Sequence, residues 1–166
     1  ACALRFLDAA VLILPFYTVM FAEHGLSPAQ IGVIMASWSL MGLALEAPTG
    51  VLADRTSRRL LLGAAQAVRC VGLLVWLAFP TFWGFLVGLM LWGLKSATLS
   101  GAFEAVVYDE LKVLGREVEY ARVIGRTQAA RFAGVMTAAL GAAPLANLGY
   151  PILIWASVAT GAAAAL

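Results

Sequence analysis

Ionisable side chains stand inside segments of this chain that are otherwise almost entirely apolar. The set comprises Asp8, Glu46, Arg69, Lys95 and Arg131, with Arg5 and Glu104 closer to the ends of their segments. An ionisable group near the centre of a bilayer costs at least about 2.5–3.5 kcal/mol on insertion scales, so it normally faces protein or water and has a partner. Carboxylates and cations placed in this way can hold a polar solute or relay protons.

Two interpretations of these charges remain open. In the first, they are neutralising pairs that lock helices together: Asp8 with Arg5 or Arg131, Glu46 with Arg69, and Glu104 with Lys95 or a loop arginine. In the second, they line a water-filled cavity that binds a polar substrate or carries protons. The second interpretation makes Asp8 and Glu46 the leading substrate or proton carboxylates, and Trp38 a candidate for the cavity wall. Arg5 also fits an anchor whose charged end reaches the inner membrane surface.

A second group of charges is concentrated in the ten residues GVLADRTSRR, at positions 50–59. Apolar runs precede and follow it directly. Its arginines, Arg55, Arg58 and Arg59, are typical of a loop that stays on the cytoplasmic side of a membrane. That explanation does not account for Asp54, nor for Gly50 four residues before it.

The composition requires lipid as the main solvent of the chain. Of its 166 residues, 63% are hydrophobic and 12% are charged, and the mean hydropathy is +0.92. Soluble domains carry about 25% charged residues. The net charge of +2 gives no indication of a nucleic-acid partner, and Cys2 and Cys70 form no metal motif. The sequence contains no phosphate-binding loop, zinc motif or nucleophile motif, so we expect neither an enzyme nor a bound cofactor or metal.

The apolar runs predict an all-α membrane protein. About 20 apolar residues are needed for one crossing. On that measure the chain contains six spans, at residues 3–21, 28–52, 60–79, 82–107, 123–146 and 150–166. Ser27 and Pro28 are a good N-cap and first helical residue for the second span. Thr49 is placed to satisfy a carbonyl group that Pro48 leaves without a donor.

Basic residues fall on alternate loops, and this predicts the orientation. The loops after the first, third and fifth spans contain no Lys or Arg, whereas those after the second and fourth contain Arg55, Arg58, Arg59, Lys112, Arg116 and Arg122. Cytoplasmic loops are the ones enriched in Lys and Arg. We therefore expect a multi-pass protein of the plasma membrane, of the bacterial inner membrane in particular, with a cytoplasmic N-terminus.

With these spans in place, residues 50–59 resemble a loop of the major facilitator superfamily that reads Gly-x-x-x-Asp-Arg/Lys-x-Gly-Arg-Arg/Lys. Gly50, Asp54, Arg55, Arg58 and Arg59 match it, while Ser57 stands where the family usually has Gly. The segments GLSPAQIG and SGAFEAVVYDEL are also similar to the family. The patterns of its fourth and fifth helices are matched poorly, which weakens an assignment as a proton-coupled drug antiporter.

The resemblance implies the N-terminal six-helix half of a twelve-helix transporter, a single unit over residues 1–166 built as 3+3 inverted repeats, 1–79 and 80–166. It implies a C-terminal six-helix half as partner, with Asp54 pairing across the two halves. The expected function is secondary active transport of a small-molecule substrate across the lipid bilayer by alternating access, with proton-coupled efflux as one form. The alternative is a membrane binding or assembly subunit that does not transport and whose buried charges are structural.

Overall fold

The computed structural model describes residues 1–165; the side chains at positions 46, 47, 50–55 and 101 lie outside the description. The described residues form helices: α1 (Cys2–Ala9), α2 (Tyr17–Glu23), α3 (Pro28–Arg55), α4 (Arg58–Ala78), α5 (Phe82–Val113), the short 3-10 helix η1 (Glu117–Glu119), α6 (Tyr120–Ala146) and α7 (Tyr150–Ala165). Within that part of the chain there is no β-strand, which confirms the predicted all-α class.

Four of these helices, α3 to α6, are each long and apolar enough to cross a membrane. Their start points match the predicted spans closely. α3 and α5 run further than predicted, to Arg55 and Val113, because the charged residues after each span continue the helix. α7 is apolar but has only 16 residues.

The prediction that residues 3–21 form one continuous helix was wrong. It consists of α1 and α2 separated by irregular backbone over residues 10–16. Pro15 has no backbone N–H to donate and disfavours helical geometry in the residue before it, so a helix cannot run through this point undisturbed. The predicted helix start at Ser27 is confirmed: its hydroxyl accepts from the backbone N–H of Gln30, and the Gln30 side chain accepts from the backbone N–H of Ser27.

The acceptor expected for Thr49 was wrong: its hydroxyl bonds to the carbonyl group next to the one that Pro48 leaves without a donor. Its hydroxyl donates to the carbonyl oxygen of Leu45 at 2.7 Å. The carbonyl group that lacks its helical donor because of Pro48 is that of Ala44. Thr49 therefore supports the same turn of α3 through the neighbouring carbonyl group.

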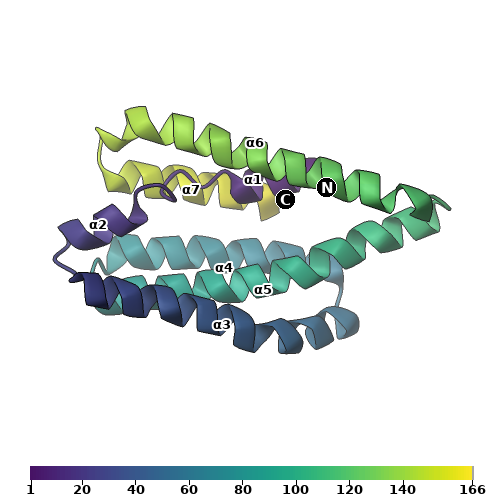
Figure 1. The fold of residues 1–166 in the computed structure, drawn as a ribbon, viewed down its shortest axis with the longest axis horizontal. Coiled ribbons are helices and arrows are strands. Elements are labelled where there is room, and N and C mark those ends of the chain that lie inside the picture. Colours follow the sequence, from purple (N-terminus) through teal and green to yellow (C-terminus); the bar gives the residue numbers. More distant parts are fainter. Residues whose placement is uncertain (166) are drawn as a thin grey trace.

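The helices are arranged as two groups of three (Figure 1). In one group α5 packs against both α3 and α4, and in the other α1 packs against α6 and α7. α4 also packs against α7 and joins the groups. The larger apolar core includes Phe21, Trp76 and Phe85, with Phe21 and Phe85 ring centroids 4.2 Å apart.

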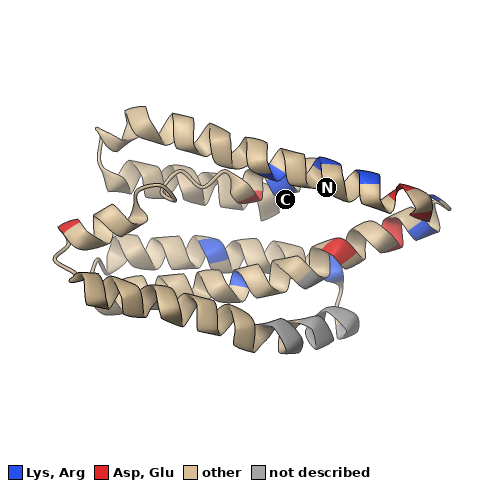
Figure 2. Ribbon diagram, in the orientation of Figure 1, with Lys and Arg blue, Asp and Glu red and all other residues tan. Residues whose placement is uncertain are grey.

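Charges are distributed unevenly along the bundle (Figure 2). Most lie toward the end where α5 finishes and α6 begins, whereas the opposite end shows acidic colour at the end of α2, the helix that finishes at Glu23. Between the two ends, a few charged residues lie inside the bundle, and these form the candidate site.

Candidate functional site

Asp8, at the end of α1, is the centre of a buried ionic cluster that we call the Asp8 cluster. Lys95 from α5 forms an ion pair with its carboxylate, Gln66 from α4 donates to Oδ1 at 2.8 Å, and an Arg69 nitrogen lies 3.7 Å from the same oxygen. All four residues are at least nine-tenths buried. The cluster therefore ties α1 to both α4 and α5 at one point inside the bundle.

The pairing expected for Asp8 was wrong. Asp8 pairs with Lys95 and Arg69 rather than with Arg5 or Arg131, and this also removes Lys95 as the partner of Glu104. The reason lies in the level of each group along the bundle. Arg5 is nearly one turn earlier on α1, and its guanidinium carbon lies 3.9 Å above the ring of Phe103, further along α5.

Arg69 stabilises the interruption of the first span. Its guanidinium donates to the backbone carbonyl oxygens of Asp8 (2.8 Å) and Ser157 (2.9 Å) and to the hydroxyl of Thr160 (2.9 Å). Backbone polar groups in a membrane must be satisfied within the protein. Arg69 therefore supplies a donor where the helix no longer does. Glu46, its predicted partner, lies outside the described residues.

Two hydroxyl groups of α7 also hydrogen-bond to the backbone of the interrupted segment. Thr160 donates to the carbonyl oxygen of Ala10 at 2.8 Å, and Ser157 accepts from the backbone N–H of Ile13 at 3.1 Å. Sequence reasoning missed Gln66, Ser157 and Thr160. A signal was present in Ser157 and Thr160, because two hydroxyl residues three positions apart share one face of an apolar helix.

A cavity of about 510 Å³ opens beside the Asp8 cluster, and we call it the charged cavity. Its charged lining residues are Arg5, Asp8, Lys95, Glu104 and Arg131, and its polar ones are Ser96, Ser100 and Gln128. They come from α1, α5 and α6. The structure thus brings four of the predicted candidates to one cavity, namely Asp8, Trp38, Lys95 and Arg131. Arg69 lies buried behind Asp8.

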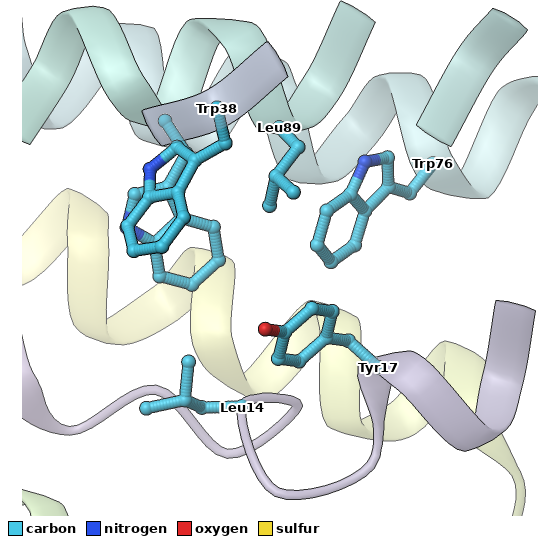
Figure 3. Close-up of a pocket in the computed structure, with 6 residues that line it drawn as sticks. Leu14, Tyr17, Trp38, Trp76 and Leu89 are labelled. Carbon is cyan, nitrogen blue, oxygen red and sulfur yellow. The ribbon is translucent and has the colours of Figure 1, made fainter. Parts of the chain in front are cut away.

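An apolar pocket of about 50 Å³ adjoins this cavity, and we call it the aromatic pocket (Figure 3). It is lined by Leu14, Tyr17, Trp38, Trp76, Leu89 and Trp92. Leu14, Trp38 and Trp92 also line the charged cavity, so the two spaces share these three side chains as a common boundary. Trp76 stacks on Tyr17 with centroids 6.0 Å apart, and its indole N–H donates to the carbonyl oxygen of Phe85.

In residues 50–59 the side chains are described only from Thr56 onward, while the backbone of residues 50–55 forms the last part of α3. Arg58 forms an ion pair with Asp109 and Arg59 forms one with Glu110. Both pairs connect the start of α4 to the last turns of α5. The side chains of Gly50, Asp54 and Arg55 lie outside the described residues. Asp109 and Glu110 were not predicted as partners, although they stand together in the segment SGAFEAVVYDEL.

A local pair fixes the loop between α5 and α6. Arg116 donates to both carboxylate oxygens of Glu119, at 2.8 and 2.7 Å. These hydrogen bonds, with the attraction of Arg116, Arg122 and Arg126, lower the pKa of Glu119. Glu119 therefore stays ionised and offsets part of the positive charge at this end of the bundle.

Comparison with known proteins gives one family and two relatives. The family pattern of the Major Facilitator Superfamily matches residues 1–166. The inner membrane transport protein YajR of Escherichia coli is 31% identical over 133 residues, which is 80% of this chain and 27% of that protein. The inner membrane protein YqcE of the same organism is 28% identical over 133 residues, which is 80% of this chain and 31% of that protein. The chain thus corresponds to less than a third of the length of either relative.

Proposed function

The chain belongs to the Major Facilitator Superfamily, and from that premise we propose that it is the N-terminal six-helix half of a secondary transporter. The transporter would move a small solute across a bacterial inner membrane by alternating access. The observation that carries the proposal is the charged cavity, because a space of about 510 Å³ lined by five ionisable residues lies among membrane-length apolar helices. Ionisable residues at such positions mark solute or proton pathways.

The second wall of the transport pathway would come from a C-terminal six-helix half. Support comes from large apolar side chains that the described part of the bundle leaves uncovered, including Leu40, Leu43, Phe132 and Leu140. Lipid would cover some of these side chains and the partner half the others. The relatives, each more than three times as long as the matched segment, have room for such a half.

Asp8 is the coupling carboxylate that we propose for proton-driven transport. Its charge holds Lys95, Gln66 and Arg69 together, so protonation would weaken contacts of α1 with both α4 and α5 at once. A single proton would thereby change the packing between the two groups of helices. Glu46 remains the second candidate carboxylate.

The loop at residues 50–59 is proposed as the cytoplasmic gate. Asp54 would contact the partner half in one state of the cycle, where a helix N-terminus favours a carboxylate by about 0.3–1 kcal/mol when exposed. The pairs of Arg58 with Asp109 and of Arg59 with Glu110 would keep the start of α4 fixed to α5 while Asp54 engages and releases.

The alternative, a membrane subunit that does not transport, has support from one feature. The Asp8 cluster is well satisfied internally and would serve as a structural tie. That alternative gives no role to Arg5, Glu104 and Arg131 around an open cavity, and we therefore favour transport.

The test uses the full-length protein purified in detergent and reconstituted into liposomes. A thermal-shift screen selects a stabilising solute, and flux of that solute is then measured with and without an imposed pH gradient. We expect flux that the pH gradient alters, and an Asp54→Asn variant that binds the solute normally but moves it slowly. A stabilising solute that crosses no faster than in empty liposomes would contradict transport.

A further inference from the structure

We propose that the charged cavity and the aromatic pocket together form one binding site for an organic anion that carries an aromatic ring. The inference rests on the proposed transport function and names the chemical class of its substrate. It follows from the balance of charge around the cavity, from one unpaired cation, and from the position of the aromatic side chains.

Cations outnumber carboxylates in the cavity wall. Arg5, Lys95 and Arg131 line the cavity together with Asp8 and Glu104, and the buried Arg69 stands directly behind Asp8. Two cations already share the Asp8 carboxylate. Among the described lining residues, Glu104 is the one carboxylate left to offset Arg5 and Arg131. Arg5 is buried, whereas Arg131 and Glu104 are exposed. Because an unpaired buried charge is costly, Arg5 favours an anionic occupant.

Arg5 is the group best placed to receive that anion. Arg5 is buried, with a relative exposure of 8%, yet it lines the cavity. Its Nε has no hydrogen-bond partner, and among the described residues no carboxylate lies within ion-pair distance of its guanidinium. Phe103 packs against the guanidinium face. The N–H groups at the edge are therefore left for a carboxylate, a partner that matches them in geometry.

A cationic solute fits the same wall poorly. The Asp8 carboxylate accepts from Lys95 and Gln66 and lies near Arg69, so a cation would have to displace protein donors to reach it. Glu104 stands in a wall that also contains Arg5 and Arg131. A ligand cation would meet repulsion from both arginines, whereas an anion gains attraction from both.

The aromatic pocket supplies the other half of the recognition. Trp38 and Trp92 stand at the junction of the two spaces, and Tyr17, Trp76 and Leu89 close the apolar end (Figure 3). The indole N–H of Trp76 is already occupied by the Phe85 carbonyl oxygen, so Trp76 offers a ligand only its ring. Aromatic rings attract one another beyond the gain from burying their area. A ring would occupy this end while its acid group reaches the arginines.

The experiment measures binding of four matched probes to the full-length protein by isothermal titration calorimetry. Phenylacetate has both ring and negative charge, phenethyl alcohol has the ring alone, phenethylammonium has a ring with positive charge, and acetate has the charge alone. We expect phenylacetate to bind about tenfold more tightly than each of the others. Equal or tighter binding of phenethylammonium, or no binding of any probe up to about 10 mM, would overturn the proposal.

Variants locate the site. Arg131→Gln should weaken phenylacetate binding about tenfold and leave phenethyl alcohol unchanged. Arg126→Gln is the matched control, because Arg126 is an exposed arginine on the same helix that does not line the cavity. Trp38→Leu should reduce the preference for phenylacetate over acetate. Arg5→Gln removes the guanidinium best placed to receive the anion and should weaken phenylacetate binding more than Arg131→Gln does. Wild-type affinity for phenylacetate in Arg5→Gln would place the anion elsewhere and contradict the assignment.

Flux measurements separate this inference from the transport proposal. If the liposomes transport another solute and phenylacetate neither binds nor competes, the anion site is wrong while transport stands. If phenylacetate binds with the expected charge preference and no solute is transported, the anion site stands while transport is wrong.

Discussion

At the scale of single residues, Asp8 is the most constrained group among the described residues. One carboxylate is approached by two cations and an amide from two other helices, all of them buried. Removing one partner from such a group leaves an uncompensated charge, which is more damaging than removing the whole pair. The contribution of Asp8 to stability can therefore be separated from that of its partners.

The Asp8→Asn variant should lose about 3–5 kcal/mol of stability, because Lys95 becomes a buried cation without a carboxylate. The double variant Asp8→Asn/Lys95→Met should recover a large part of this loss, since Met fills a similar volume without charge. Thermal unfolding of the full-length protein in detergent measures both. Equal destabilisation in the single and double variants would show that the Asp8–Lys95 pair is not the relevant contact.

Sequence reasoning identified the charged members of this cluster but not their pairing. A charge in an apolar segment can be recognised from the sequence alone, which is how Asp8, Arg69 and Lys95 were found. Which charges meet depends on the level of each residue along three helices, and an error of a few residues at a helix end changes the partner. Gln66 carries no charge, so nothing in the apolar pattern of α4 distinguished it.

At the scale of elements, the interruption between α1 and α2 shows where the apolar pattern is insufficient. Residues 3–21 are hydrophobic enough to cross as one helix, and Pro15 was the only local indication of a break. Hydrogen bonds from helices far along the chain satisfy the backbone at this break. They come from Arg69, Ser157 and Thr160. The break could not have been predicted without knowing that α4 and α7 pack there.

The contact between α1 and α6 depends on Gly134. A Cβ atom at this position would lie against the backbone carbonyl group of Phe6 and 3.2 Å from the Cβ of Ala9. Backbone atoms cannot rotate out of the way as a flexible side chain can. Gly134→Ala should therefore separate the two helices and lower the free energy of unfolding by about 1–3 kcal/mol. Thermal unfolding of the full-length protein measures the loss.

Gly141→Ala provides the control for this change on the same helix. A Cβ at Gly141 meets nothing within 4 Å, so this variant should be neutral or slightly stabilised by better helix propensity. Similar melting temperatures for the two variants would mean that close approach of α1 and α6 does not limit stability.

At the scale of the whole molecule, the packing pairs agree with the expected pair of three-helix repeats. Exchanging residues 1–79 with 80–166 relates α1 to α5, α3 to α6 and α4 to α7. The contact of α1 with α6 then corresponds to that of α5 with α3, and α4 packs against its own counterpart α7. The repeat remains a prediction, since the two halves show no convincing residue-level match.

The orientation of the bundle is a prediction from its charged end, and cysteine labelling can measure it. In a full-length protein whose own cysteines, Cys2 and Cys70 included, are all replaced by Ala, a cysteine at His24 should react with a membrane-impermeant maleimide in intact spheroplasts. A cysteine at Val118, which is 95% exposed between α5 and α6, should react only after permeabilisation. The reason is that the Val118 loop is flanked by Arg116, Arg122 and Arg126, whereas the His24 loop contains no Lys or Arg.

The cysteine-free protein with no cysteine introduced controls for background labelling. Reversed accessibility, with Val118 labelled first, would place residues 50–59 outside the cell. In that case Asp54 would have no part in a cytoplasmic gate, and the pairs of Arg58 with Asp109 and Arg59 with Glu110 would fix an extracellular end. Labelling in the expected order places the gate, the loop after α5 and the charged end of the bundle on the cytoplasmic side.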